Sequence, residues 1–313
     1  MSRQFPDSNT IERAAQRINR MKPPKSKTAE VLSARVSLNI AMRTGKYEEC
    51  IRYTDRIIDV FKKSPALIQG HTNFKLFVTA IYYGANFRTY LRQYKESDEL
   101  MRLLESPLNV RQCDPGLYYE VKTLHELAMG VATYDLSRSR KAIGEYELLP
   151  AELHMQIPAI KQSEIFFTAA IASIIDGTPK DALRFVNIIR ASKPTDIRND
   201  LRQYIRVLFL IIHFDLNNLD VVETGIKAGR ISFKRKNVLN PFYDAVFKLF
   251  SKMTRAKSIQ KSEIAIREFL DHYSGEKAQF WASMNNYFNL RAWLTSKLEQ
   301  RDFFKTLQED EKL

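Results

Sequence analysis

Turn signals separate pairs of apolar stripes along this chain, and they recur at nearly constant intervals. The first turn lies at Gly45, within RTGKYEECIRYTDRII (residues 43–58). Over residues 47–61, apolar side chains recur three or four positions apart and charged side chains occupy most of the positions between them, as in an amphipathic helix. Over residues 31–42, a second apolar stripe ends shortly before the glycine, which suits the left-handed backbone just past a helix end. The two stripes predict a helical hairpin.

The same plan appears four more times. Hairpin tips near residues 90, 135, 177 and 218 follow the first tip near 45, at intervals of 41 to 45 residues. In the clearest case, the apolar run IFFTAAIASII (165–175) ends at Asp176-Gly177, and a new stripe begins after Thr178-Pro179. Repeats of this kind bury the apolar face of each helix pair against neighbouring pairs. We therefore predict an all-α fold, an α-solenoid of stacked antiparallel helical hairpins, with about twelve to fifteen helices of ordinary length.

A short polar residue followed by proline marks four further boundaries. The side chain of such a residue can accept a hydrogen bond from the first turn of a helix, and proline lacks only an amide that has no partner there. The four pairs are Ser64-Pro65, Asp114-Pro115, Thr178-Pro179 and Asn240-Pro241. Each pair is expected to begin a helix.

The composition favours helices over a many-stranded β structure. Hydrophobic residues make up 44% of the 313 residues, which can supply a substantial core. The chain has only ten glycines and eleven prolines, so it offers few of the tight turns that many short strands need. No convincing alternation of polar and apolar residues extends over several positions.

Cysteine content and hydropathy bear on the compartment. Cys50 and Cys113 are too few for a disulfide framework, which predicts a reducing compartment. The basic N-terminal segment lacks the apolar stretch of a secretory signal. The most apolar runs, 165–175 and 207–212, are much shorter than the roughly 20 residues that cross a bilayer, so we predict no membrane span. A cytoplasmic location is expected.

Two regions are predicted along the chain. Residues 1–28 are polar and basic and are expected to form a short helix and a linker. Residues 29–313 are predicted to form the helical-repeat domain, with capping helices at its C-terminal end. Trp281 and Trp293 lie in these last helices, where large aromatic side chains can seal a stack.

Two hairpins resemble part of a known repeat. Gly45-Lys46-Tyr47 with Cys50 at the small position, and Gly177 with Ala182 at that position, are similar to the second half of a tetratricopeptide repeat. The interval exceeds the repeat length of about 34 residues, and the first-helix signature of tryptophan, leucine, glycine and tyrosine is missing from both hairpins. The chain resembles a divergent tetratricopeptide-like protein, of the kind found among long bacterial helical-repeat proteins. The resemblance implies a scaffold that binds proteins or peptides on a concave face.

The sequence contains no recognisable catalytic, cofactor or metal motif. His125-Glu126 begins like the helix motif of zinc proteases, but Met129 stands where the second histidine is needed. The other histidines are scattered, and the cysteines form no C-x-x-C pair. No phosphate-binding glycine loop, nucleophile elbow or dinucleotide-binding turn appears. We expect no catalytic residue, no cofactor and no metal, and we expect His125 at the surface or at its boundary.

Positive charge is concentrated in one segment. The net charge is +13, and residues 227–261 contain ten basic residues against the single acid Asp244. The basic residues are Lys227, Arg230, Lys234, Arg235, Lys236, Lys248, Lys252, Arg255, Lys257 and Lys261. As a partner-binding surface we single out Lys234, Arg235, Lys236, Lys248, Lys252 and Arg255.

Three interpretations of this segment stay open. The simplest is a solvated outer face, because positive charge also complements the dipole at a helix end. The second is a surface for an acidic protein or peptide, and the third is a nucleic-acid-binding surface with salt-dependent contacts to phosphates. Our leading hypothesis is a non-catalytic scaffold for a protein or peptide partner. A nucleic-acid-binding repeat protein is the alternative, and an enzyme on an unrecognised helical scaffold is a third hypothesis.

Overall fold

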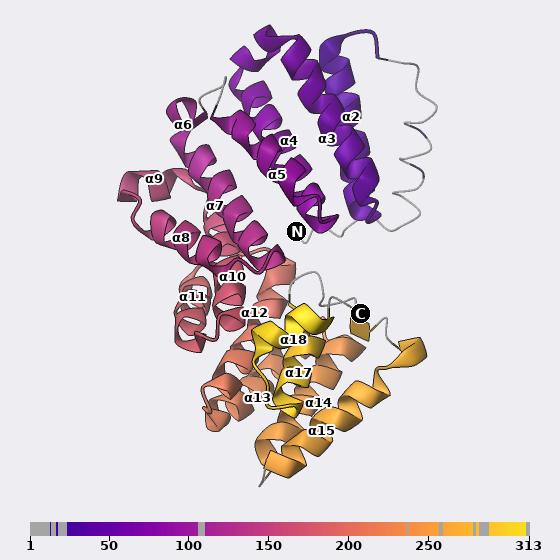
Figure 1. Ribbon diagram of the computed structural model, residues 1–313, viewed down its shortest axis with the longest axis vertical. Helices are drawn as coiled ribbons and strands as arrows, with labels where there is room; N and C mark the ends of the chain where they lie inside the picture. Colours follow the sequence, from indigo (N-terminus) through magenta and orange to yellow (C-terminus); the bar gives the residue numbers. More distant parts are fainter. Residues whose placement is uncertain are drawn as a thin grey trace. The chain divides into compact units, whose positions relative to one another are not determined.

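The computed structural model consists of helices joined by short turns (Figure 1). It describes residues 24–105, 110–236, 238–256, 259–277, 280–281 and 288–310, together with Arg13 and Arg17. Over these residues there is no β-strand, which confirms the all-α prediction. The predicted N-terminal helix and linker lie mostly outside the described residues. The chain divides into two compact units, Met1–Ile157 and Pro158–Leu313.

The first unit is a series of helices, most of which pack against the next one along the chain. Its α-helices are α2 (Lys27–Arg43), α3 (Tyr47–Lys63), α4 (His71–Tyr90), α5 (Tyr94–Met101), α6 (Val110–Cys113), α7 (Pro115–Ala132), α8 (Leu136–Glu147) and α9 (Ala151–Gln156). Two 3-10 helices, η1 (Pro65–Gln69) and η2 (Arg102–Leu104), lie between them. Helix α2 contacts α3, α3 contacts α4, and α4 contacts α5. Helix α4 also packs on α7, and α7 contacts α6, α8 and α9.

The second unit repeats this sequential packing. Its α-helices are α10 (Ala159–Ile175), α11 (Pro179–Ala191), α12 (Asn199–Asp215), α13 (Leu219–Arg235), α14 (Pro241–Arg255), α15 (Ile259–His272), α17 (Leu290–Leu298) and α18 (Phe303–Asp310). The 3-10 helices are η3 (Pro194–Asp196) and η4 (Gly275–Lys277). Each helix from α10 to α14 contacts the next one, α15 contacts α17, and α17 contacts α18.

Five helix pairs are joined by turns of the same length, at the predicted hairpin tips. In α2/α3, α4/α5, α7/α8, α10/α11 and α12/α13, three residues separate the two helices. One residue of each turn has left-handed backbone: Gly45 (φ 67°), Arg92 (φ 60°), Tyr134 (φ 59°), Gly177 (φ 70°) and Asn217 (φ 57°). The predicted tips near residues 45, 90, 135, 177 and 218 are therefore confirmed.

A hydrogen bond spanning six residues closes the first helix in four of these hairpins. In each case the amide just after the left-handed residue donates to a carbonyl in the last turn of the helix, as in the Schellman motif. These bonds run from Lys46 to Ala41, from Gln93 to Arg88, from Thr178 to Ser173 and from Asn218 to His213, at 2.8–3.0 Å. The bond ends the helix and turns the chain back toward it.

The four polar-proline pairs begin helices, but only two of the polar side chains accept a cap. Asp114 accepts from the amide of Leu117 at 3.0 Å, and Asn240 accepts from Tyr243 at 3.0 Å. The Thr178 hydroxyl instead donates to the carbonyl of Ser173 at 3.1 Å, because this residue also closes the preceding helix. Ser64 precedes the 3-10 helix η1 and makes no side-chain cap.

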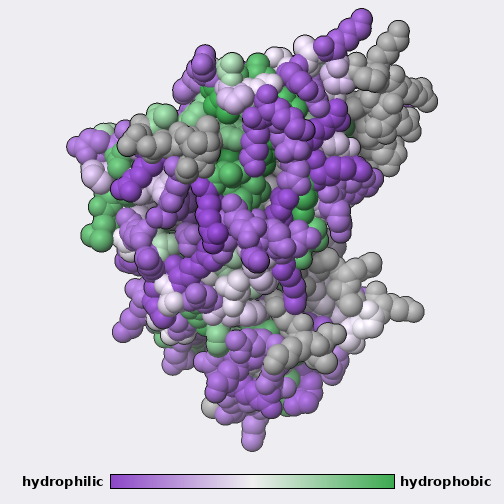
Figure 2. Space-filling model, turned by 45° about the horizontal axis from the view of Figure 1, so that its top comes forward, coloured by the Kyte–Doolittle hydropathy of each residue, from purple (hydrophilic) through white to green (hydrophobic). Residues whose placement is uncertain are grey.

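Burial follows the predicted stripes. On α3 the buried residues include Cys50, Ile57, Ile58 and Phe61, all within the stripe read from the sequence. Hydrophilic residues predominate on the face shown in Figure 2, and hydrophobic residues gather in patches between them. None of the described helices combines the length and the apolar character needed to cross a bilayer.

Trp293 anchors the C-terminal helices of the second unit. Its side chain is fully buried, and its indole Nε1 donates to Asp215 on α12 at 3.2 Å. Its ring stacks on Phe250 of α14 and meets Phe214 of α12 edge-on, with centroid distances of 5.9 and 5.8 Å. These contacts hold α17 against two helices that lie far from it in the sequence.

Close packing of α7 on α8 generates a stability prediction. A Cβ added at Gly130 would lie 2.1 Å from the Ser139 Oγ and 2.9 Å from the Asp135 carbonyl oxygen. At Gly144, on α8, an added Cβ meets nothing within 4 Å. We expect Gly130→Ala to lower the free energy of unfolding by about 1–3 kcal/mol, because the two helices must move apart. Urea denaturation measures this change.

Gly144→Ala is the matched control. It makes the same chemical change in a helix without a clash, so we expect it to raise the free energy of unfolding by roughly 0.5–1 kcal/mol. Equal effects of the two substitutions would contradict the close approach of α7 and α8.

Candidate functional site

The predicted basic segment lies on α13, α14 and α15 of the second unit, and two of its lysines are ion-paired. The Lys248 Nζ lies 2.8 Å from an oxygen of Asp244, which also contacts Arg230 at 3.3 Å. The hydrogen bond from Lys248, opposed by partial burial, holds the pKa of Asp244 below its ordinary value. The Lys252 Nζ lies 3.0 Å from Glu268 on α15. Lys257 lies outside the described residues.

Two of the predicted site residues line a groove between α14 and α15. The groove has a volume of about 390 Å³, and Lys252, Arg255 and Lys261 contribute its basic side chains. Its apolar lining includes Ala256, Ala265 and Ile264. The side chain of Ile264 is 55% exposed, an unusual position for a large aliphatic residue. The groove therefore combines positive charge with apolar surface.

The other predicted residues separate at the end of α13. Lys236 lies in the positive field of Arg235 and of Arg202 and Arg206 on α12. Arg190 on α11 adds its charge at Arg206. We call these five residues the arginine cluster. Lys234 instead contributes to the positive field at Asp244 on α14. The structure thus places Lys252 and Arg255 in the groove and Arg235 and Lys236 in the cluster, while Lys234 and Lys248 act on Asp244.

Electrostatics inside the arginine cluster are repulsive. Burial lowers the pKa of Arg206 from its ordinary value, and the charges of Arg190 and Arg202 lower it further. Burial also lowers the pKa of Lys236, and the charges of Arg202, Arg206 and Arg235 lower it further. Each of these neighbours disfavours the charged form because it carries the same charge.

The arginines of α11 and α12 were missed from the sequence because they lie outside the basic segment. One local signal was available: Arg198, Arg202 and Arg206 are four residues apart and so share one face of α12. The contribution of Arg190 from another helix depends on the tertiary packing of α11 against α12.

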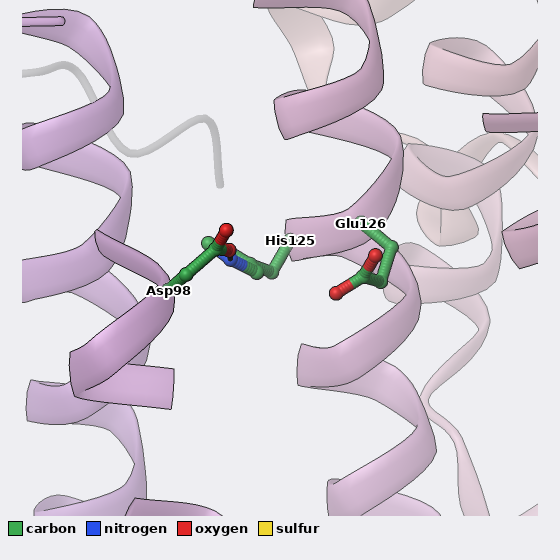
Figure 3. A group of neighbouring side chains, drawn as sticks. All are labelled: Asp98, His125 and Glu126. Atoms are coloured by element: carbon green, nitrogen blue, oxygen red, sulfur yellow. Dashed lines mark hydrogen bonds and ion pairs between the residues drawn. The ribbon is translucent and has the colours of Figure 1, made fainter. Parts of the chain in front are cut away.

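A second group of ionisable residues lies inside the first unit (Figure 3). Figure 3 shows Asp98 of α5 and His125 of α7 pointing toward each other, with Glu126 beside them on α7. The His125 Nε2 lies 3.1 Å from an Asp98 oxygen. His125 is only 1% exposed, so the prediction of a surface or boundary histidine is wrong. Its place is inside because a carboxyl group from α5 satisfies one ring nitrogen.

Arg138 of α8 joins the two carboxylates. Its guanidinium donates to Glu126 at 2.6 and 2.9 Å and to Asp98 at 2.7 and 3.2 Å. Burial alone would raise the pKa of Asp98, but hydrogen bonds from Arg138 and His125 hold it below its ordinary value. Burial lowers the pKa of His125, so its ring is neutral near pH 7.

The chemistry of this group fits an ion-pair network better than a metal site. Asp98, His125 and Glu126 offer ligand atoms within 4.8 Å of one another, a geometry that a metal ion can use. Both carboxylates, however, already accept hydrogen bonds from Arg138, and the guanidinium charge opposes a second cation there. The network ties α5, α7 and α8 together.

Comparison with protein-family models, with curated proteins and with solved structures gave no match. The resemblance to tetratricopeptide-like proteins thus rests on the hairpin motifs themselves.

The network makes Arg138 a key residue for stability. We expect Arg138→Met to lower the free energy of unfolding by about 2 kcal/mol, because Asp98 and Glu126 lose their charged donor while staying partly buried. Urea denaturation at neutral pH is the measurement. Lys141→Met on the same helix is the control. The Lys141 side chain is 79% exposed and lies 4.0 Å from Glu145, so we expect a change below about 0.5 kcal/mol. Similar losses for both variants would argue against the network.

The buried histidine predicts a pH dependence. Because the pKa of His125 is lower in the folded chain than its ordinary value of 6.5, the unfolded chain binds more protons below that pH. The stabilising effect is fully present above pH 6.5 and is lost as the pH falls toward the folded pKa. We expect the stability advantage of the wild type over His125→Gln to shrink between about pH 7.5 and about pH 5.5.

Urea denaturation at the two pH values, with His71→Gln as control, measures this effect. His71 is exposed, so its removal is expected to leave the pH dependence nearly unchanged. Asp98 does not interfere, because its ordinary pKa of 3.8 and its lowered pKa both lie below the window. An unchanged pH dependence in His125→Gln would show that this ring does not titrate as argued.

Proposed function

We propose that this chain is a non-catalytic interaction scaffold with a tetratricopeptide-like solenoid architecture, and that it binds an acidic protein or peptide. The architecture is supported by five hairpins with identical three-residue turns and by the contact of most helices with the next one along the chain inside each unit. The low cysteine content, with only Cys50 and Cys113 in the chain, supports a cytoplasmic location.

The α14–α15 groove is the proposed binding site, and its lining indicates the chemistry of the partner. It has three basic side chains, Lys252, Arg255 and Lys261, against the single carboxylate of Glu268. Arg255 is exposed and forms no ion pair within the part of the chain that the structure describes. Ile264 adds an apolar contact, and burying such a side chain is worth about 1.5–3 kcal/mol. An extended acidic segment with one apolar residue matches this lining.

A second groove, between α2 and α3 of the first unit, is less suited to an acidic partner. Its lining includes four basic side chains, Lys27, Arg52, Arg56 and Lys63, and four acidic ones, Glu30, Glu48, Asp55 and Asp59. Several of these are already paired, such as Arg56 with Glu30 at 3.2 Å. The charges balance, so the groove has no preference for an anion.

Binding is proposed rather than catalysis because the ionisable groups that gather inside the first unit are engaged in structural pairs. Asp98 and Glu126 are held by Arg138, and the His125 Nε2 donates to the ionised carboxylate of Asp98. The two grooves described above are lined by other residues.

The test is capture of a partner on the immobilised full chain from a nuclease-treated lysate, followed by measurement of Kd with the purified partner. We expect the double variant Arg255→Glu/Ile264→Asp to weaken binding at least tenfold, about 1.4 kcal/mol, because it reverses a charge and removes the apolar contact. Lys227→Glu is the control for reversal of an exposed charge on α13, outside the groove, and should change Kd less than about twofold.

Two outcomes would contradict the proposal. Equal binding by the wild type and the double variant would remove the α14–α15 groove as the site. Loss of all retained material after nuclease treatment, with salt-dependent binding of the pure chain to nucleic acid, would favour the nucleic-acid alternative.

A further inference from the structure

Helix α2 carries apolar side chains on two of its faces. One face is buried and packs against α3, and its members are Val31, Ala34, Leu38 and Ala41. Leu32 and Val36 lie one turn apart on the far side of the helix, where they are 50% and 46% exposed. Ile40, one further turn along, is partly buried. Large aliphatic residues are mostly buried in folded proteins, so this exposed pair needs a cause. We call Leu32, Val36 and Ile40 the outer face of α2.

The packing plan of the first unit predicts a neighbour for this outer face. Helix α3 contacts α2 before it and α4 after it, and so is covered from two sides. In a series of stacked helices, each member with a neighbour on both sides buries two apolar faces. Helix α2 has the sequence of such a member. In this plan its preceding neighbour is the segment before Lys27.

The segment before α2 has the sequence of an amphipathic helix. Asn9 and Glu12 are three positions apart, as in a capping box at the start of a helix. The apolar residues that fall on one side of such a helix are Ile11, Ala14, Ala15, Ile18 and Met21. Arg13 and Arg17, which the structure describes, are helical and exposed, and helical spacing puts them opposite the apolar stripe. The segment thus offers one apolar face and one basic face.

A short link limits how this segment can meet α2. Residues 22–26, with Pro23-Pro24 among them, separate Met21 from the start of α2, and five residues are an ordinary length for a link between two helices. When the chain reverses over this link, the equal rise of the two helices brings Ile18 level with Leu32. By the same register Ala14 comes level with Val36, and Ile11 with Ile40. The two apolar stripes therefore match position by position.

We propose that residues 9–21 form a helix that docks on the outer face of α2 and closes this end of the first unit. Docking removes the side chains of Leu32 and Val36 from water, together with those of Ile11 and Ile18. A five-residue link holds the segment at an effective concentration in the millimolar range, which favours it over a second copy of the chain. The inference concerns the first unit and does not depend on the acidic partner proposed for the α14–α15 groove.

The first experiment joins the segment to α2 by a disulfide in the full chain. Cys113→Ser removes the exposed thiol, and Cys50 stays because it is fully buried. Ile18→Cys/Leu32→Cys then places two thiols at the expected contact, and diamide serves as the oxidant. We expect an intrachain disulfide, because the bond forms readily only where the two Cα atoms lie within about 7 Å of each other.

Arg17→Cys/Leu32→Cys is the matched control. It has nearly the same tether, but its first thiol lies on the basic face of the segment. We expect its disulfide to form at least about tenfold more slowly than that of Ile18→Cys/Leu32→Cys. Equal rates, followed on non-reducing gels, would show that the segment does not dock by its apolar face. A disulfide-linked dimer in place of the intrachain product would assign the outer face to a second copy, and would also overturn the proposal.

Hydrogen exchange tests the same contact without added cysteines. Ile11→Gln/Ile18→Gln removes two side chains of the apolar face, and Arg13→Gln/Arg17→Gln introduces the same residue twice on the basic face. We expect amide exchange in α2 to become at least about fivefold faster in the first variant and to stay within about twofold of the wild type in the second. Exchange in α7 should be unchanged in both, because α7 packs on other helices of the unit. Equal exchange of α2 in the two variants would contradict docking.

Discussion

The fold depends on how each hairpin closes. In four of the five hairpins, a left-handed residue after the first helix lets an amide donate across six residues to a carbonyl of the last turn, and the next helix begins immediately. Because the link has only three residues, the second helix runs antiparallel to the first and packs against it. The apolar stripe of one helix is then buried by its neighbour, and the remaining apolar surface by the next helix in the series. Helix order, core and surface follow from this local event.

The hairpin positions were predictable because their signals are local. Gly45 and Gly177 favour left-handed backbone, and Asn217 tolerates it, so these turns are visible in the sequence. The turns at Arg92 and Tyr134 are weaker signals, because neither residue type favours positive φ. There the tertiary packing of the two helices outweighs the backbone preference. The capping role of Thr178 could not be read from sequence, since its hydroxyl serves the preceding helix.

The sites were predictable only in part, for a different reason. The density of basic residues in 227–261 is a property of the sequence, but which of them lie together is a property of the packing. Lys252 and Arg255 meet Lys261 across a groove, whereas Lys236 meets Arg202 and Arg206 from an earlier helix. His125, which begins an incomplete zinc motif, likewise belongs to an ion-pair network that the sequence did not predict. The other members, Asp98 and Arg138, come from separate helices. The spacing of residues within one helix does not reveal side chains that come together from different helices.

The three-residue turns also limit where this chain can change length. One residue added inside a helix rotates everything after it by about 100°, which would turn the apolar stripe toward water. A three-residue turn closed by its own hydrogen bond has too little backbone freedom to compensate for such a rotation. The links between hairpins, such as 148–158 and 192–198, contain short helical turns and irregular backbone that can accommodate extra residues. Insertions and deletions in homologues should therefore accumulate in those links, and the hairpins should keep a constant length.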